Sequence, residues 1–491
     1  MERLDQYVTK AFNANKDNPF LISEDKSLTY ISCQKVLQKI SSKLSENSNK
    51  HEGVVILCND KWSGLQAILS CLINQCPYIP LDTLAPFSRN FKIISENKFK
   101  HIIISKEIYE SNKNEITGNF HLIDLNDIDA YLLVRDIEVD LMRSDVAFVL
   151  FTSGSTGTPK GILISHQNAL CFIKWSVALM GNLDKQTFSS IAPFHFDLSV
   201  FDIYVSILKG SRLFLFENED IRNPRYVTQM IDKFHINVTY TTPTVYNLIL
   251  QFGKLKKRSL SSLTNIIFAG EQMSCLTLDA LRHKCPKSKF YNFYGPTETN
   301  VCAYFDATKY DTSLSAEVPI GNACPYDKIK IASANDGQEG QLLVSGESVF
   351  IGFLNSENQT KSSLIKSQDH IWYQTGDIVI INDYDQYVYV GRADRMVKVK
   401  GNRIELQEIE YVLNQMHDII NSGVITKKVD DELKIIAFIE SKSEVAIDTE
   451  NIKNECISQL PYYMIPNSFI LVEKLPLNSN SKLDYKTLSS W

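Results

Sequence analysis

The stretch from residue 146 to residue 161, VAFVLFTSGSTGTPKG, changes character halfway along. Its first part is apolar, aromatic and β-branched, and this composition predicts a buried strand. The second part, from Thr152 to Gly161, is rich in Gly, Ser, Thr and Pro, which compete with regular structure and predict a loop. Such a loop offers backbone N–H groups, hydroxyls and the ammonium of Lys160 to a bound polyanion. It is not a Walker A loop, because no Gly-Lys-Ser/Thr sequence closes it.

Strand-like and helix-like segments alternate on both sides of this loop. Before the loop, residues 54–58 (VVILC) and 101–105 (HIIIS) are typical of buried strands, and helical periodicity covers 62–73. After the loop, we expect helices at 168–180 and 226–234 and strands at 212–216, 237–241 and 264–268. This alternation predicts βαβ units and a largely parallel sheet.

The pattern changes twice towards the C-terminus. Between about 319 and 389, short strands at 341–344, 378–381 and 387–390 are separated by Asn, Asp and Gly and predict an antiparallel or barrel-like unit. The last part has strand-like segments at 397–400, 419–425 and 433–439 and helix-like segments at 406–416 and 449–460. The predicted fold is therefore α/β. It has a large N-terminal domain (1–393) of βαβ sheets plus the barrel-like unit, and a small α+β C-terminal domain (394–491), joined by a short hinge at 391–394.

Charge and cysteine usage exclude several classes of protein. The net charge of −6 argues against nucleic acid or an anionic membrane as a partner. The ten cysteines are scattered without a CxxC pair, which predicts reduced, mostly buried thiols in a cytoplasmic protein. The charged, amphipathic N-terminus is not typical of a signal peptide. No apolar run approaches the ~18 residues that a spanning helix needs, so we expect no membrane association.

Five further segments follow the Gly-rich loop in order. They are FHFDLSVFD (194–202), NFYGPTET (292–299), YQTGD (373–377), GRADRMVKVKGNRIE (391–405) and PLNSNSKLD (476–484). In this order and spacing, with TSGSTGTPKG ahead of them, they resemble the motifs of the adenylate-forming enzymes. That superfamily includes adenylation domains of nonribosomal peptide synthetases, acyl-CoA synthetases and luciferases. The resemblance covers essentially the whole chain, with one departure: Ser481 stands where the family usually has Gly before the last lysine.

The resemblance implies the adenylate-forming enzyme fold, with a mobile C-terminal domain, and an activity that uses ATP and Mg²⁺ to activate a carboxylic acid as its acyl-AMP. Because a carboxylate attacks the α-phosphate, two anions meet, and the site needs cations and N–H donors. By the resemblance, Lys482 bridges the substrate carboxylate and the α-phosphate, and Glu298 holds Mg²⁺. The implied catalytic residues are Lys482, Lys160, Thr297 and Arg392.

The same motifs imply the nucleotide contacts. Tyr294 is expected to stack on adenine, Asp377 to accept both ribose hydroxyls, and Arg392 to contact the ribose. The Gly-rich loop is expected to hold the β- and γ-phosphates. The implied ATP-binding residues are Thr152, Ser153, Gly154, Ser155, Thr156, Gly157, Gly270, Glu271, Asn292, Phe293, Tyr294, Gly295, Thr297, Asp377 and Arg392.

The segment FDLSVFD points to the class of acid. In the amino-acid-activating branch of the family, an Asp at the position of Asp197 pairs with the substrate ammonium. Enzymes for fatty or aryl acids have no ammonium to neutralise, and a buried unpaired carboxylate would cost them several kcal/mol. The motif alignment gives as substrate pocket His195, Asp197, Leu198, Phe201, Tyr240, Ile267, Ala269, Phe293, Val301 and Cys302.

This pocket predicts a compact apolar amino acid. Apart from Asp197 it offers no carboxylate or ammonium to a polar side chain, and its three aromatic residues leave little room for Phe, Tyr or Trp. Proline, alanine, valine or a near relative remain. The set is similar to that of stand-alone prolyl–carrier-protein ligases of the pyrrole and anatoxin-type pathways, and less similar to that of D-alanyl–carrier ligases.

The partner is expected to be a separate carrier protein. No HHxxxDG condensation motif is present and no carrier-domain serine motif follows Trp491, so we expect a free-standing enzyme that meets a phosphopantetheine carrier in trans. By the resemblance, the small domain rotates about Asp394 between two half-reactions, with the Lys400–Gly401 face serving the second. L-proline is the leading substrate. The alternatives are a D-alanyl or other small-amino-acid ligase, an acyl-CoA synthetase, and an inactive homologue that binds ATP or acts as a scaffold.

Overall fold

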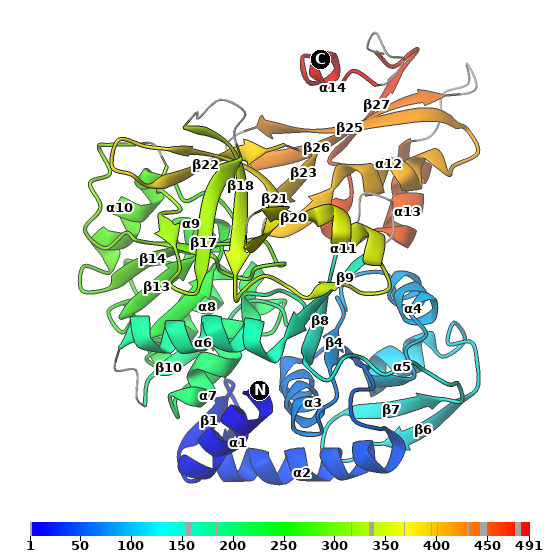
Figure 1. Cartoon of the computed structure of the whole chain (residues 1–491), viewed down its shortest axis with the longest axis vertical. Helices are drawn as coiled ribbons and strands as arrows, with labels where there is room; N and C mark the ends of the chain where they lie inside the picture. The colour runs from blue at the N-terminus through cyan, green and yellow to red at the C-terminus, as the bar shows by residue number, and fades with distance from the viewer. Residues whose placement is uncertain are drawn as a thin grey trace. The chain divides into compact units, whose positions relative to one another are not determined.

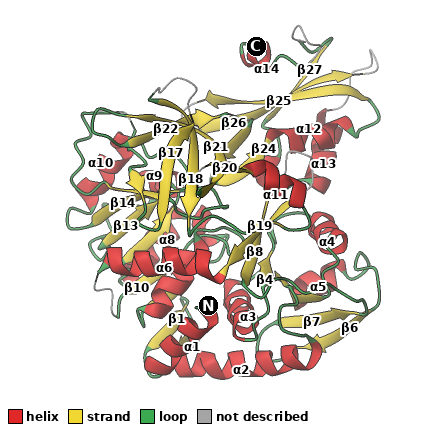
Figure 2. Cartoon of the chain, in the orientation of Figure 1, coloured by secondary structure: helices red, strands yellow, loops and turns green. Residues whose placement is uncertain are grey.

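The computed structural model describes two compact units, and Figure 1 follows the chain through them. The described residues are 2–153, 159–181, 185–315, 317–332, 338–367, 369–393, 395–399, 401–429, 432–441, 449–476 and 483–491. The first unit comprises 1–82, 97–150 and 161–393, and the second comprises 83–96, 151–160 and 394–491. The architecture is mixed α/β, as predicted, with helices flanking the sheets (Figure 2).

An eight-stranded sheet contains the strand that leads into the Gly-rich loop. Its order is β19-β9-β8-β4-β3-β5-β7-β6. The strands are β3 (Val54–Leu57), β4 (Tyr78–Pro80), β5 (His101–Ser105), β6 (Phe120–Asp124), β7 (Ala130–Arg135), β8 (Val146–Thr152), β9 (Lys160–Ser165) and β19 (Gly352–Phe353). Helices α3 (Lys61–Ile73) and α5 (Lys106–Asn112) pack on this sheet, whereas α2 (Tyr30–Asn47) contacts β1 and β2 of the second sheet and α1 (Leu4–Ala14) packs against other helices. The parallel strands β3, β4 and β5 are wholly buried, which explains their continuous apolar sequences.

A nine-stranded sheet of order β16-β15-β14-β13-β12-β10-β11-β1-β2 forms the second layer. Its strands are β1 (Pro19–Ile22), β2 (Ser27–Thr29), β10 (Thr187–Ser190), β11 (Arg212–Leu215), β12 (Val238–Thr241), β13 (Asn265–Phe268), β14 (Lys289–Tyr294), β15 (Ala303–Asp306) and β16 (Asn322–Ala323). Its helices are α6 (His166–Met180), α7 (Ser206–Leu208), α8 (Pro224–Lys233), α9 (Pro243–Phe252) and α10 (Cys275–Lys284), with a π-helical turn at Phe201–Val205 and a 3₁₀ turn at Asp220–Arg222. Because β12, β13 and β14 run parallel, their carboxyl ends bring the predicted site residues Tyr240, Ala269 and Tyr294 to one edge.

A five-stranded antiparallel sheet completes the first unit. Its strands are β17 (Asp327–Ala332), β18 (Glu339–Gly346), β20 (Leu364–Ser367), β21 (His370–Ile381) and β22 (Tyr387–Arg392), and α11 (Glu357–Ser363) precedes β20. The antiparallel pairing predicted for this region is confirmed. The pairing of β21 with β22 places Asp377 directly opposite Arg392.

The second unit has its own core. It contains α4 (Phe87–Glu96), the hairpin β23 (Met396–Val399) and β24 (Asn402–Glu405), α12 (Leu406–Asn414), β25 (Ile419–Val429), β26 (Glu432–Ser441), α13 (Thr449–Gln459), a 3₁₀ turn (Tyr462–Met464), β27 (Ser468–Val472) and α14 (Tyr485–Ser489). Apolar residues of α12, α13, β25 and β26 pack together. A buried ion pair joins Arg89 of α4 to Glu408 of α12.

Two sequence predictions need correction. The predicted loop is shorter than expected, because Thr152 ends β8 and Lys160 begins β9, whose apolar residues 162–164 continue the sheet. The two large sheets are parallel at their centres, as predicted, but the β6–β7 hairpin and β2, β15, β16 and β19 add antiparallel strands at the margins that the alternation did not predict.

All ten cysteines are free thiols and eight of them are buried, so the burial predicted for them is confirmed, whereas the cytoplasmic location stays a prediction. Among the described residues, no helix is both long and apolar enough to cross a membrane.

Candidate active site

Tyr294, Asp377 and Arg392 come together in the first unit. An Nη of Arg392 donates to the Asp377 carboxylate at 2.7 Å and to the Thr375 carbonyl at 2.6 Å, and the Tyr294 hydroxyl donates to the other Asp377 oxygen. Asp377 is 2% exposed. Burial and the adjacent carboxylate raise the pKa of Tyr294, so its hydroxyl stays a donor. A carboxylate accepts about four hydrogen bonds, so Asp377 keeps the capacity for two vicinal hydroxyls.

The turn after β14 is tightly folded. A Cβ at Gly295 would lie 1.9 Å from the carbonyl oxygen of Asn300, so only glycine fits there. The amide N–H of Phe350 donates to the carbonyl oxygen of Glu298 at 2.8 Å. Thr297 and Glu298 follow Tyr294 closely in this turn. The side chain of Thr297 is half-buried and that of Glu298 is buried.

Glu298 fits the predicted magnesium role. Magnesium bound with a nucleotide takes one or two carboxylates from the protein and its other oxygens from phosphates and water. Within the described ranges no group of three His, Cys, Asp or Glu side chains is arranged to hold a metal. Glu298 supplies one buried carboxylate, which is the number of protein ligands that such a magnesium ion needs.

Two predicted ATP contacts have structural partners. The Glu271 carboxylate accepts from the backbone N–H and the hydroxyl of Thr244 at 2.9 and 2.7 Å, at the start of α9. The Asn292 amide donates to the carbonyl of Pro319 at 2.8 Å. Gly270 has φ +85° and turns the chain between β13 and Glu271. These residues shape the carboxyl edge of the sheet, and nucleotide contact by them stays a prediction.

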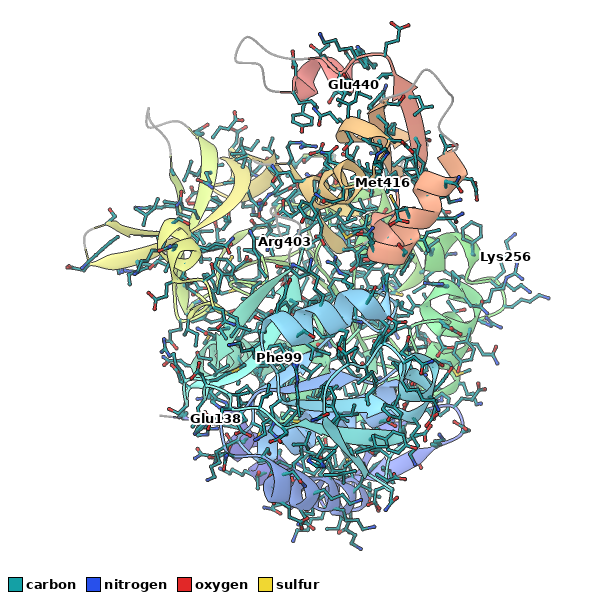
Figure 3. All side chains as sticks on the ribbon, turned by 90° about the vertical axis from the view of Figure 1, so that its right-hand side faces the viewer. Phe99, Glu138, Lys256, Arg403, Met416 and Glu440 are labelled. Atoms are coloured by element: carbon teal, nitrogen blue, oxygen red, sulfur yellow. The ribbon has the colours of Figure 1, made fainter. Side chains whose placement is uncertain are left out.

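The Gly-rich loop is described only at its ends, because Gly154, Ser155, Thr156 and Gly157 lie outside the described residues. The Ser153 hydroxyl donates to the carbonyl of Arg403 at 2.8 Å and accepts from the N–H of Glu405 at 3.1 Å. Arg403 is labelled in Figure 3 and lies in β24 of the same unit. In this arrangement Ser153 binds a strand backbone, although the sequence predicted a phosphate contact. The buried Thr152 hydroxyl has no hydrogen-bond partner among the described residues.

The predicted substrate pocket contains a compact aromatic cluster. The rings of Phe201, Tyr240 and Phe293 meet edge to face, with centroids 5.3, 5.7 and 6.3 Å apart. Ile267, Ala269, Val301 and Cys302 are buried with them, and Asp197 and Leu198 are half-buried. Burial and then the charge of Asp197 raise the pKa of Tyr240, which places that carboxylate near the ring. The π-helical turn Phe201–Val205 begins with the last two residues of the motif FHFDLSVFD, and such turns recur at functional sites.

His195 stands beside Asp82. Its Nε2 lies 3.9 Å from an Asp82 carboxylate oxygen. Burial lowers the pKa of His195, and the positive charge of Lys61 lowers it further. The charge of Asp82 acts in the opposite direction but does not reverse the change. The imidazole is therefore neutral at neutral pH.

Comparison with known proteins decides the family. A model of the AMP-binding enzyme family matches residues 8–354. The chain belongs to this family. This AMP-binding enzyme is 30% identical over 420 residues to an L-proline–[L-prolyl-carrier protein] ligase of Pseudomonas fluorescens, covering 83% of this chain and 82% of that one. It is 31% identical over 485 residues to a D-alanine–D-alanyl carrier protein ligase of Staphylococcus haemolyticus, covering 97% of this chain and 96% of that one.

Solved structures confirm the fold. The adenylation domain AlmE of Vibrio cholerae, in complex with glycyl-adenosine-5′-phosphate, superimposes with a TM-score of 0.83 at 23% identity. The match covers 99% of this chain and 97% of that one. The family model and the two curated carrier-protein ligases show the activity: this AMP-binding enzyme is an AMP-forming ligase that uses ATP.

Sequence reasoning missed one cluster beside the substrate pocket. Lys61 and Asp202 of this AMP-binding enzyme are both buried, at 3% and 1% exposure. A lysine at a helix start usually indicates a solvated surface charge, so the sequence gave no reason to select it. The apolar residues around it, from Trp62 to Ile73, were the available signal, because they predict that this helix is buried.

Proposed function

We propose that this enzyme activates L-proline as prolyl-AMP and transfers it to the phosphopantetheine thiol of a separate carrier protein. The observation that carries the proposal is the half-buried carboxylate of Asp197, which lies near Tyr240 in a pocket whose buried members are aromatic or apolar. A carboxylate there neutralises a substrate ammonium, and the packed rings of Phe201, Tyr240 and Phe293 suit a short apolar side chain. The likeness to a prolyl–carrier ligase over 83% of the chain supports the same substrate.

In the proposed first half-reaction, one carboxylate oxygen of the amino acid bonds to the α-phosphorus of ATP. The bond between the α-phosphorus and the oxygen that links it to the β-phosphate breaks, and pyrophosphate leaves. We assign Lys482 and Thr297 to the oxygens that carry negative charge, and Asp377 with Arg392 to the ribose. Magnesium, held by Glu298 and the phosphates, would neutralise the departing pyrophosphate. In the second half-reaction the carrier thiolate attacks the acyl carbon and AMP leaves.

Amino-acid-dependent ATP–pyrophosphate exchange tests the substrate. We expect L-proline to give at least about tenfold more exchange than glycine, L-alanine or L-valine, because small differences in side-chain size cost roughly 1–3 kcal/mol in an apolar pocket. Equal exchange with alanine or valine would contradict the assignment to proline, and exchange with a fatty acid would contradict the role of Asp197.

D-alanine is the second candidate, because the D-alanyl carrier ligase of Staphylococcus haemolyticus matches 97% of this chain. Including D-alanine in the same exchange panel separates the two candidates. Preference for D-alanine over L-proline would make this enzyme a D-alanyl–carrier ligase, with the same chemistry and the same Asp197 contact.

We also propose that residues 394–491 act as a mobile domain that pivots at Asp394, a residue outside the described set. Proline fixes φ near −65°, so Asp394→Pro is expected to spare adenylate formation and to lower thioester formation at least about tenfold. Exchange assays report the first half-reaction, and loading of a holo carrier protein reports the second. Equal loss of both half-reactions would argue against a pivot at this position.

A further inference from the structure

Lys61 is a buried lysine at the first position of α3. Its Nζ donates to three backbone carbonyls, those of Ser190, Ile191 and Ala192, at 2.8, 3.0 and 2.9 Å. These contacts use all three donors of the ammonium. The carbonyls belong to the last residue of β10 and the first two residues after it. The ammonium is therefore bound to one end of the segment that leads to His195 and Asp197.

Carboxylates compensate this buried charge. Both carboxylate oxygens of Glu217 accept from the backbone N–H of Lys61, at 2.9 and 3.2 Å. Asp202 lies in the π-helical turn, where burial raises its pKa well above the usual value although the charge of Lys61 and the N–H of Ile191 oppose this change. The carbonyl of Ile191 thus binds the ammonium, and its N–H faces the carboxyl group of Asp202. A buried ammonium without partners would cost several kcal/mol. The three carbonyls and the surrounding acidic groups offset this cost of desolvation.

The segment after Ala192 is short and closely folded. The N–H of Phe196 donates to the carbonyl of Pro193 at 3.0 Å, and the Ser199 hydroxyl donates to the carbonyl of Phe196 at 2.7 Å. The Lys61 ammonium also lies 5.6 Å from the ring centre of Phe194. A displacement at Ile191 would therefore be transmitted to Asp197 through few rotatable bonds.

We propose that Lys61 is a positioning residue of the substrate site, whose ammonium fixes the backbone that presents Asp197 to the amino group of the amino acid. This inference rests on the proposed contact between Asp197 and that amino group. Lys61 acts through the backbone and touches neither substrate. Loss of the ammonium should therefore weaken amino-acid binding and leave ATP binding nearly unchanged.

The Lys61→Met variant tests this separation, because methionine keeps the apolar length and removes the charge. The KM for the amino acid in pyrophosphate exchange should rise about tenfold or more, since hydrogen bonds from a charged donor are lost. The KM for ATP should change less than about twofold, because its binding uses other contacts. Lys106→Met is the matched control, because Lys106 also begins a helix but pairs with Asp124 at 3.0 Å with 31% of its side chain exposed. Both KM values should stay unchanged in this control.

A pH profile gives a second reading. Burial lowers the pKa of Lys61 to about 8, and the charges of Glu217, Asp202 and Asp220 oppose this change. The titratable groups around it are Asp60, His195, Asp202, Glu217 and Asp220. Lys61 is charged below about pH 8 and loses its proton above it, so the amino-acid KM of the native enzyme should rise from pH 7 to pH 9. Arginine stays charged over this range, so the amino-acid KM of Lys61→Arg should rise less between pH 7 and pH 9. Any rise that remains in this variant reports the titration of the substrate's own amino group.

The results separate three outcomes. A selective rise in amino-acid KM for Lys61→Met, with a flatter profile for Lys61→Arg, supports the proposal. An equal change in both KM values, or a lower Tm with both KM values unchanged, overturns it. If Lys61→Met does not fold, the Lys61→Arg profile decides alone. Asp197→Asn is measured in parallel: an unchanged amino-acid KM there would overturn the proposed pocket itself, whatever Lys61 does.

Discussion

Replacing Lys482 with alanine should lower the rate of adenylate formation by about 10²- to 10³-fold, the usual effect of removing one group that stabilises transition-state charge. The reason is electrostatic, because the carboxylate and the α-phosphate repel each other until a cation lies between them. We expect Lys482 to carry a solvated charge, so stability should change by no more than about 0.5 kcal/mol. Pyrophosphate exchange measures the first effect and thermal unfolding the second.

The control for this variant is Lys434→Ala, a lysine of β26 in the same unit that pairs with Glu432 at the surface. It should keep native exchange. Thioester formation from supplied prolyl-AMP should persist in Lys482→Ala, because the lysine serves only the first half-reaction. Near-native exchange in Lys482→Ala would remove Lys482 from the proposed mechanism.

The described segment that follows Lys482 is anchored within the second unit. Arg395 binds both carboxylate oxygens of Glu410 at 2.9 and 2.8 Å, and its guanidinium stacks 3.4 Å from the ring centre of Tyr485. The Tyr485 hydroxyl donates to the same carboxylate at 3.2 Å. Arg395, which follows the predicted hinge, and Tyr485, which begins α14, thus both bind Glu410 of α12.

Much of the fold could be predicted from apolar periodicity. The predicted strand at 101–105 coincides with β5, and the predicted helix at 62–73 lacks only the first residue of α3. Agreement is weaker where strands carry polar residues: the predicted range 341–344 covers only the middle of β18 (Glu339–Gly346), and β6, which is mostly exposed, gave no signal. Alternation predicted parallel strands, but it carried no information about the strands at the sheet margins, whose pairing depends on distant residues.

The site was predictable where a motif fixes the chemistry. Tyr294 and Arg392 come from different motifs, and both donate a hydrogen bond to Asp377 in the structure. Partners outside the motifs were not predictable. Nothing near Glu271 in the sequence indicates that its carboxylate binds Thr244, and nothing near Ser153 indicates the backbone of β24. Lys61 shows the same limit, because its three carbonyl partners lie about 130 residues away along the chain.

Replacing Asp377 with alanine should have the largest combined effect on binding and stability. Its carboxylate is the shared partner of Arg392 and Tyr294, and the side chains of Arg392 and Asp377 are only 9% and 3% exposed. Removing one member of a buried pair leaves the other charge without compensation and costs about 3–5 kcal/mol. The predicted ribose contact would be lost as well, so the KM for ATP should rise together with the loss of stability.

Three variants distinguish the two effects. Asp377→Asn keeps the shape and one acceptor, so it should recover part of the stability while the KM for ATP stays high. Tyr294→Phe removes one donor to a charged acceptor and should cost about 1.5–3 kcal/mol without exposing the guanidinium.

Asp383→Ala, in the exposed turn between β21 and β22, is the control and should match the native enzyme in both measurements. Denaturant unfolding and ATP titration of the folded variants give the two values. If Asp377→Ala bound ATP normally, the carboxylate would be a structural counter-ion of Arg392 alone, and the ribose would be held by other groups.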